Sequence, residues 1–172
     1  MAVSPDNNHV YTASYAAGAI MVYSRNTGTG ELTFVEMLED SGNDAASNLI
    51  DGLNGAYSVT VSPDNNHVYV ASLLEDAIAV FSRNTSTGVL TFVETLKDGV
   101  NGVDGLDGAR SVSVSSDNNH VYVASNVDHA IAVFSRNTST GVLTFVETLK
   151  DGVNGVDGLN NAYSVTVSPD NN

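Results

Sequence analysis

The chain alternates short apolar runs with clusters of turn residues. In residues 58–72, SVTVSPDNNHVYVAS, Val59 and Val61 alternate with small polar residues, as they do on the pleated surface of a strand. The SPD sequence that follows supplies turn chemistry, and Asn65 is of the residue type that best tolerates a positive φ. The pattern therefore predicts a strand, a tight turn and a second strand over residues 67–71.

Four strands are expected in each stretch of this kind. In the middle of the chain they cover residues 58–61, 67–71, 77–82 and 89–96, and a loop rich in Gly and Asp follows over residues 97–108. The first three strands are apolar on both faces, whereas the fourth is mixed, as an outer strand should be. No segment shows helical spacing with caps. We predict an all-β protein whose sheets are covered on both sides.

The hairpin between the third and fourth strands carries its own prediction. Gly88 is the expected positive-φ residue of this loop. If the hairpin closes at Arg83 and Val89, cross-strand pairing places Val80 opposite Phe92.

These strands recur at a fixed period. Ser62, Ser115 and Ser168 occupy the same place in successive units and are spaced 53 residues apart. The first unit is five residues longer, and the extra length falls in the loop over residues 41–48, where an insertion costs little free energy.

A repeated unit of roughly 40–50 residues, with four antiparallel strands buried on both faces, is typical of a β-propeller blade. The turns of a β-solenoid are much shorter, and a β-sandwich would not repeat its sequence. The predicted blade units cover residues 1–55, 56–108 and 109–161, and a strand over residues 162–167 is expected to complete another blade. Together they form a single propeller-fragment domain.

Composition and charge narrow the classes of partner. The 172 residues leave room for one ordinary domain, and the formal net charge of −14 would repel nucleic acid and anionic lipid. No apolar run approaches the length that spans a membrane, and the absence of Cys excludes disulfides and thiolate metal sites. Met1 stands in the middle of a repeat unit without a secretory signal, so we expect the chain to be a fragment or a deliberately shortened protein.

The repeat resembles a known family. SVTVSPDNNHVYVAS followed by AIAVFSRNTSTGVLTFVETL is similar to the blade of the lactonase-type β-propellers, which include 6-phosphogluconolactonase-like proteins and YVTN-type surface propellers. Asn65 and Asn118 replace the Gly that usually follows the Asp of the family pattern. The resemblance implies a bacterial origin, outside the cell or on its surface, and in the family Arg, His and Glu near the central channel bind an anionic substrate.

Three blades leave an apolar sheet face bare at each end of the stack, and monomers seldom expose such patches beyond about 300–600 Å². We therefore expect self-association. The favoured arrangement is a homodimer that closes a six-bladed ring, in which residues 162–167 supply the inner strand of the first blade of the other copy. A nine-bladed trimer and a piece of a longer propeller remain open alternatives.

One repeat position is a candidate binding site. The residue just before the first strand of a unit is Tyr57, Arg110 or Tyr163, which breaks the repeat, and the innermost strand of a propeller lines its channel. Only Arg110 matches the substrate-binding residues of the lactonase-type enzymes in kind. The histidines, arginines and glutamates that recur in every unit are expected to be structural, the arginines by pairing within their own blade, and no catalytic residue is assigned.

The long loops are a second candidate site. They place an oxygen ligand at about every third position with glycines between, which suits a hard cation such as Ca²⁺. The spacing differs from an EF-hand, and the competing interpretation is a solvated run of turns; no other cofactor is expected. The candidate ligands are Asp98, Asn101, Asp104, Asp107, Asp151 and Asp157.

The near identity of the later units favours a scaffold over a tuned, asymmetric catalytic site. The sequence therefore favours a non-catalytic propeller module that is structural or binds a ligand or protein. The alternative is a lactonase-like hydrolase that acts on a small anionic sugar lactone.

Overall fold

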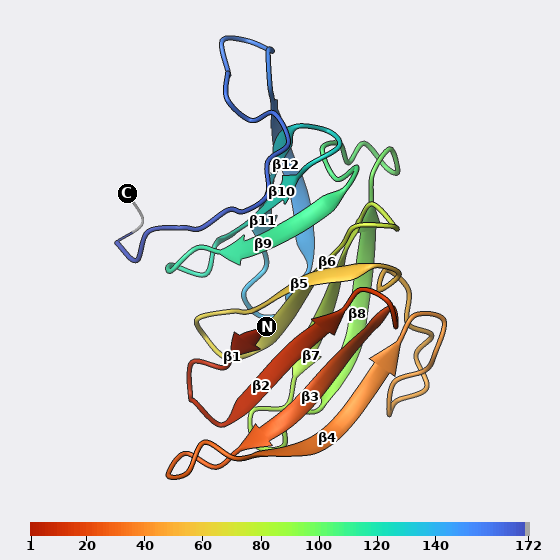
Figure 1. The fold of residues 1–172 in the computed structure, drawn as a ribbon, viewed down its shortest axis with the longest axis vertical. Helices are drawn as coiled ribbons and strands as arrows, with labels where there is room; N and C mark the ends of the chain where they lie inside the picture. The colour runs from red at the N-terminus through yellow and green to blue at the C-terminus, as the bar shows by residue number, and fades with distance from the viewer. Residues whose placement is uncertain (171–172) are drawn as a thin grey trace.

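The computed structural model describes residues 1–170 and shows an all-β protein in which the described residues form twelve strands in three four-stranded antiparallel sheets (Figure 1). The sheet orders are β1-β2-β3-β4, β5-β6-β7-β8 and β9-β10-β11-β12, so each sheet is one predicted blade. The strands are β1 (Ala2–Val3), β2 (His9–Ser14), β3 (Ala19–Arg25), β4 (Leu32–Glu39), β5 (Ala56–Val61), β6 (His67–Ser72), β7 (Ala77–Arg83), β8 (Leu90–Lys97), β9 (Ala109–Val114), β10 (His120–Ser125), β11 (Ala130–Arg136) and β12 (Leu143–Lys150).

The predicted turns form as expected. Asn65 has a φ of 68° between β5 and β6, and Asp64 accepts a hydrogen bond from the backbone N–H of Asn66 at 3.1 Å. Asn7 and Asn118 adopt the same left-handed conformation in the other two sheets, and Gly88 has a φ of 80°. The prediction that Asn serves where Gly is usual is therefore confirmed.

The predicted register of the β7–β8 hairpin is wrong by one residue. The strands pair Arg83 with Leu90 and Phe81 with Phe92, and a β-bulge between Val80 and Phe81 then shifts the register by one more residue, so Val80 lies opposite Glu94. The bulge recurs in the first and third sheets. An extra residue of this kind bends the strand and increases its twist, which alternation of side chains alone does not reveal.

The apolar core lies between the sheets. One cluster fills the space between the first and second sheets, including Ile20, Val68 and Phe81, and a second fills the space between the second and third, including Tyr69 and Val121. All six residues of β6 are buried, so the middle sheet is covered on both faces, as predicted.

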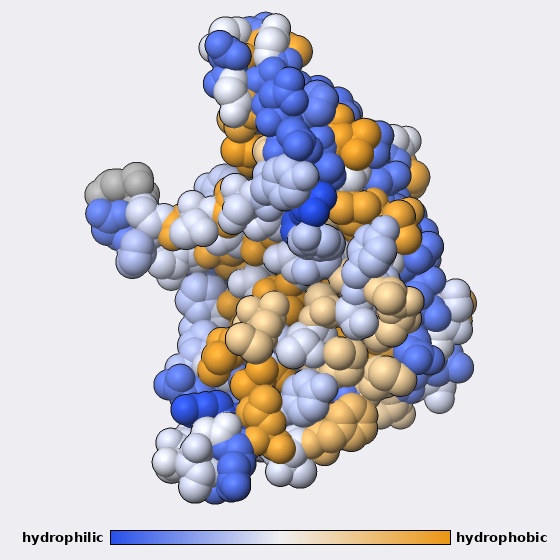
Figure 2. Space-filling view, in the orientation of Figure 1, coloured by the Kyte–Doolittle hydropathy of each residue, from blue (hydrophilic) through white to orange (hydrophobic). Residues whose placement is uncertain are grey.

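The two ends of the stack differ from its middle. Leu32 and Phe34 of β4 are 49% and 59% exposed, whereas Leu90 is fully buried at the place of Leu32 in the next sheet. Figure 2 shows apolar side chains gathered over the first sheet, in the lower part of the view. At the other end, Val146 of β12 is 53% exposed.

The same buried contacts join each pair of neighbouring sheets, and we call them the inter-blade clasp. The Arg83 side chain is fully buried; it donates from Nη2 to Asp6 Oδ2 at 2.9 Å and to His9 Nδ1 at 2.8 Å, and from Nε to the Tyr11 hydroxyl at 2.7 Å. The Tyr11 hydroxyl donates in turn to the carbonyl of Gly88 at 3.0 Å.

The second junction repeats the clasp, with Arg136 bound to Asp64, His67 and Tyr69 at the same atoms. Burial raises the pKa of Tyr69 to about 12. Burial and the neighbouring Arg136 lower the pKa of His67, which keeps its ring neutral and able to accept a hydrogen bond. The expected pairing within one blade is correct for a loop carbonyl, at Asn118, but wrong for the carboxylate, which comes from the preceding blade.

Residues 162–167 do not form a strand in the single chain. They lie beside β9, where the Val165 N–H donates to Ser111 Oγ at 3.2 Å, just as Val112 of β9 donates to Ser58 Oγ of β5. The segment thus takes the place of the next inner strand without pairing, and its completion of another blade stays a prediction. Among the described residues there is no helix that is long and apolar enough to cross a membrane.

Candidate functional site

A β-bulge positions each of the two central residues of the predicted binding site. The β5–β6 register passes from Ala56 opposite Ser72 to Ser58 opposite Ala71, so Tyr57 is the extra residue. Arg110 is the extra residue of β9 in the same way. A bulge re-aims its side chain and disrupts the ladder locally, which makes it a common device next to active sites.

The structure brings all three predicted residues together. The guanidinium carbon of Arg110 lies 4.4 Å from the ring centroid of Tyr57 and 4.1 Å from that of Tyr163, so the cation is held between two aromatic faces. Arg110 Nη2 also donates to the Tyr57 hydroxyl at 2.8 Å. Tyr57 and Tyr163 are 44% and 53% exposed, so the stack is open to solvent.

A fourth ring, which the sequence interpretation missed, belongs to this group. Tyr15 packs edge-on against Tyr57, with their ring centroids 6.4 Å apart. Its signal in the sequence is the same as that of Arg110, because Leu73 and Asn126 occupy its place in the later units and the repeat is broken there too.

The charge of Arg110 is available to a ligand. Its Nε is buried and has no hydrogen-bond partner among residues 1–170, and Arg110 forms no ion pair within that range. By contrast, clasps hold Arg83 and Arg136, and carboxylates hold Lys97 and Lys150. A guanidinium presents a planar fork of donors that matches carboxylate and phosphate. The stack can therefore bind a small anion.

Three residues that could act as a general base are engaged in other hydrogen bonds. His67 is engaged in a clasp, His129 Nδ1 accepts from the backbone N–H of Asn161 at 2.9 Å, and Glu94 accepts from the N–H of Leu143 at 2.7 Å. At the two junctions the repeated histidines, arginines and glutamates hold neighbouring blades together, which is a structural role. What this part of the fold offers is anion binding.

The predicted calcium loop is organised by an ammonium group. Oxygen atoms of Asp98, Asp104 and Asp128 lie within 4.8 Å of one another, but Lys150 Nζ is 2.9 Å from both Asp104 and Asp128. Asp98 accepts from the backbone N–H of Leu106 at 2.9 Å. These contacts favour the interpretation as a run of turns, in which carboxylates bind backbone donors and a lysine.

The other predicted metal ligands are spread along the two loops. Burial and the neighbouring carboxylates, Asp76 first among them, raise the pKa of Asp107, and Asp151 accepts from the N–H of Leu159 at 2.7 Å. Asn101 and Asp157 are exposed. The six residues do not gather around one point, and a calcium site there stays a prediction.

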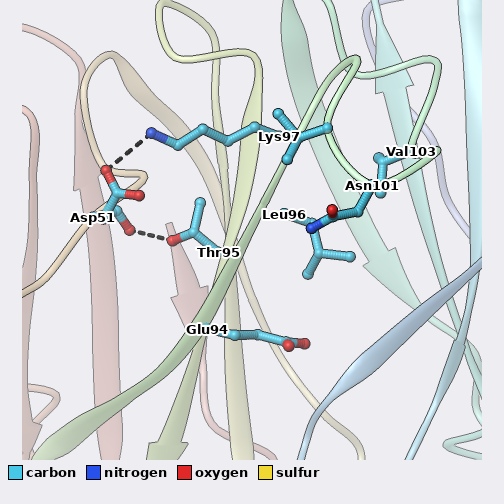
Figure 3. A pocket seen from close by; sticks show the side chains of 8 residues that line it. Asp51, Glu94, Thr95, Leu96, Lys97, Asn101 and Val103 are labelled. Carbon is cyan, nitrogen blue, oxygen red and sulfur yellow. Dashed lines mark hydrogen bonds and ion pairs between the residues drawn. The ribbon is translucent and has the colours of Figure 1, made fainter.

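A cavity of about 440 Å³ lies against β8 and the loop that follows it (Figure 3). Lys97 reaches from it to Asp51 at 3.0 Å, and burial raises the pKa of Glu94. Glu94 bonds the backbone of the next blade, as Glu36 bonds Leu90, so its role is structural. The cavity is lined by Asp51, Glu94, Thr95, Leu96, Lys97, Val100, Asn101 and Val103.

Chelation tests the loops directly. We expect an excess of EDTA to leave the melting temperature of the chain unchanged, because Lys150 already neutralises Asp104 and Asp128. A Ca²⁺ ion present at one hundred times its Kd would add about 2.7 kcal/mol of stability, which a calorimetric melt resolves easily. A rise in melting temperature on adding CaCl₂, reversed by EDTA, would show that the loops bind calcium.

Comparison with known proteins gives a consistent result. The family model described as lactonase, seven-bladed β-propeller, matches residues 1–156. A 6-phosphogluconolactonase of Klebsiella pneumoniae (strain 342) is 26% identical over 162 residues, which cover 94% of this chain and 44% of that protein. The chain thus spans less than half the length of the curated relatives that it matches.

Solved structures show the same fold. A periplasmic gluconolactonase of Pseudomonas aeruginosa superimposes with a TM-score of 0.68 at 22% identity, covering 87% of this chain and 39% of that one. A protein of Bacteroides fragilis gives a TM-score of 0.69 at 19% identity, covering 86% and 37%.

These matches contradict the prediction of a non-catalytic module. The curated relatives carry the name of a hydrolase, and the alternative interpretation, a lactonase-like enzyme, agrees with them better. The near identity of the units misled the functional prediction, because it describes the scaffold and is silent on the few positions that break the repeat.

Proposed function

The chain belongs to the family of seven-bladed β-propeller lactonases, and on that premise we propose that it supplies part of the substrate site of a hydrolase that opens a small anionic sugar lactone. The observation that carries the proposal is the open guanidinium of Arg110 between two tyrosine rings. The curated relatives, named 6-phosphogluconolactonases, make a phosphorylated sugar lactone the substrate class to test first.

Arg110 would bind the anionic group of the substrate. Its guanidinium forms no ion pair in residues 1–170, and the protein as a whole is strongly acidic, so this cation would attract a phosphate or carboxylate. Hydrogen bonds to charged groups contribute about 1.5–3 kcal/mol each. The Tyr57 and Tyr163 rings lie against the guanidinium and would hold it in place for the substrate.

The reaction adds water across the ester bond of the lactone, giving a carboxylic acid and a free hydroxyl. The proposal assigns to Arg110 the binding and orientation of the substrate's anionic group, which holds the ester at a fixed distance from the groups that act on it. No residue is assigned here to the activation of the water.

A hydrolysis assay on this chain tests the proposal. We expect acid release from 6-phosphogluconolactone above the spontaneous rate, and a roughly 10–100-fold lower kcat/KM in Arg110→Ala, because one charge-assisted contact is lost. Arg110→Lys should recover part of the loss, since it keeps the charge without the planar fork.

Thr85→Asp is the control, because it changes the net charge by the same amount at an exposed hairpin position of the middle sheet. Binding of the product, 6-phosphogluconate, by calorimetry provides a readout that is independent of turnover. A wild-type chain that neither accelerates hydrolysis nor binds the product, or an Arg110→Ala variant equal to wild type in both assays, would overturn the assignment.

A further inference from the structure

Two blade junctions in one chain show how a third would be made. At each junction one sheet presents a socket, formed by the first and third residues of its second strand: His9 and Tyr11 in the first sheet, His67 and Tyr69 in the second. The next sheet presents a key, formed by the Arg that ends its third strand and by the Gly of the following hairpin. The same atoms meet in both junctions: the distance from Arg Nε to the Tyr hydroxyl is 2.7 Å in the first and 2.6 Å in the second, and Arg Nη2 lies 2.8 Å from His Nδ1 in both.

The first sheet carries a key that meets no socket in residues 1–170. Arg25 is only partly buried and donates from Nη1 to the carbonyl of Asn7 of its own blade, at 3.2 Å. Gly30 has a φ of 81°, and a Cβ built there would meet nothing within 4 Å. At the equivalent glycines of the two junctions, Gly88 and Gly141, such a Cβ would lie 2.3 Å from a histidine ring.

The third sheet carries a socket that meets no key in the described chain. His120 and Tyr122 stand at the places of His67 and Tyr69, but both are only half-buried, whereas Tyr69 is fully buried. Glu147 is exposed, although Glu94 at the same place accepts from a backbone N–H of the next sheet. Tyr122 also lines an apolar cavity of about 350 Å³, with Ile131, Val133, Leu149 and residues 165–168.

We propose that these two end faces bind each other between two copies of the chain, head to tail, with Arg25 and Gly30 of one copy against His120 and Tyr122 of the other. The argument for a second copy is complementarity. The hairpin SRNTGTG of residues 24–30 differs from SRNTSTG of residues 82–88 at one position. The key of the first sheet therefore matches the kind of socket that binds such a key at both junctions. Exposed apolar residues of β4 and β12 would be buried in the same contact.

The C-terminal segment fits the same contact. β1 pairs with β2 at Val10 and Tyr11 alone, whereas β5 pairs with β6 up to Ser72. By the repeat register, residues 162–164 of the other copy would continue this inner strand opposite residues 13 and 14, since Met1 already stands at the place of Val165. The docked pair therefore gains main-chain hydrogen bonds as well as the clasp.

At one pair of positions the proposed contact would be repulsive, and this gives a variant that tests it. Lys97 and Lys150 pair with Asp51 and Asp104 of the preceding loop at the two junctions. In the first blade Glu39 occupies the lysine position, and Asp157 occupies the aspartate position of the last loop. Head-to-tail docking would bring these two carboxylates near each other, so Glu39→Lys should strengthen the association.

Sedimentation velocity over a range of protein concentrations tests the proposal on the full chain. We expect the wild type to reach twice its mass of 17.9 kDa, and Gly30→Ala to weaken the association by about tenfold or more, because its Cβ would meet the His120 ring. Gly99→Ala is the matched control: Gly99 has a φ of 69° and is equally open, but lies away from the contact. Glu39→Lys should tighten the association several-fold.

The outcomes separate cleanly. A monomer at all concentrations overturns the proposal. An assembly also overturns it if Gly30→Ala leaves the association unchanged, or if Gly30→Ala and Gly99→Ala weaken the association equally. A weaker association in Glu39→Lys has the same meaning. A closed trimer with the expected variant pattern supports the same contact. Because Arg110 is not part of either end face in this scheme, lactone hydrolysis can fail or succeed independently of the association.

Discussion

Replacing Arg83 by Ala is expected to lower the free energy of unfolding by about 3 kcal/mol or more. The change removes the cation from a buried charged cluster and leaves the remaining polar groups without their hydrogen-bond donor. The Arg83 side chain is fully buried between the first two sheets, where it binds Asp6, His9 and the Tyr11 hydroxyl. Urea unfolding followed by circular dichroism measures the change.

Arg25→Ala is the matched control, because it removes the same residue from the same repeat position in a blade without a preceding socket. In samples dilute enough to be monomeric it should cost a few tenths of a kcal/mol, as surface substitutions do. Equal losses from Arg25→Ala and Arg83→Ala would show that the clasp contributes no stability.

The clasp also gives Arg83→Ala a pH signature. Burial tends to raise the pKa of Asp6, but hydrogen bonds from Ser4 and Asn8 and the Arg83 cation outweigh it, so the pKa is lowered. A carboxyl whose pKa is lowered on folding stabilises the protein above its unfolded pKa of about 3.9 and loses that contribution as the pH falls through the folded pKa. The difference between wild type and variant should shrink accordingly below about pH 4.

The strand order and the turns were predictable because both are encoded locally. Alternating apolar residues specify a pleated strand, and Asn65 accommodates the left-handed turn wherever it recurs. The period of 53 residues then identifies equivalent positions in each blade. Arg110, Tyr57 and Tyr163 stood out for the opposite reason, since they depart from the repeat at the place of the innermost strand.

The contacts between blades were not predictable from the repeat. The repeat shows that the residues equivalent to Arg83, Asp64 and Tyr69 are present in every blade. Because every blade holds the same set, the sequence does not say whether an arginine binds the aspartate of its own blade or that of the preceding blade. The structure resolves this, because Arg136 reaches back to Asp64 across the junction.

The lysine in the acidic loop was not predictable for a related reason. Asp98 and Asp104 follow each other along the chain as oxygen ligands would, but Lys150, which pairs with Asp104, lies 46 residues beyond it. Loop composition reports which donors are present but not which cation reaches them. The missed bulge between Val80 and Phe81 is similar, since period-two alternation assumes a regular ladder.

Replacing Gly141 by Ala should cost about 3 kcal/mol, which combines a left-handed backbone with overpacking. Gly141 has a φ of 80°, and its Cβ would lie 2.3 Å from Cδ2 of His67. The ring cannot swing away without breaking its hydrogen bond to Arg136, and it is 3% exposed. The clash would therefore separate the second and third sheets where the clasp joins them.

Gly99→Ala isolates the backbone part of that cost, because Gly99 has a φ of 69° with no atom near its Cβ position, and it should lose only about 1 kcal/mol. Guanidinium unfolding at matched m-values compares the two variants. If their losses are equal, His67 yields freely and the junction is loosely packed; a loss in Gly141→Ala larger by about 2 kcal/mol shows that the histidine is held in place. His120 stands at the same position of the last sheet. The cost measured for Gly141→Ala therefore indicates how much Gly30→Ala should weaken the proposed contact with His120.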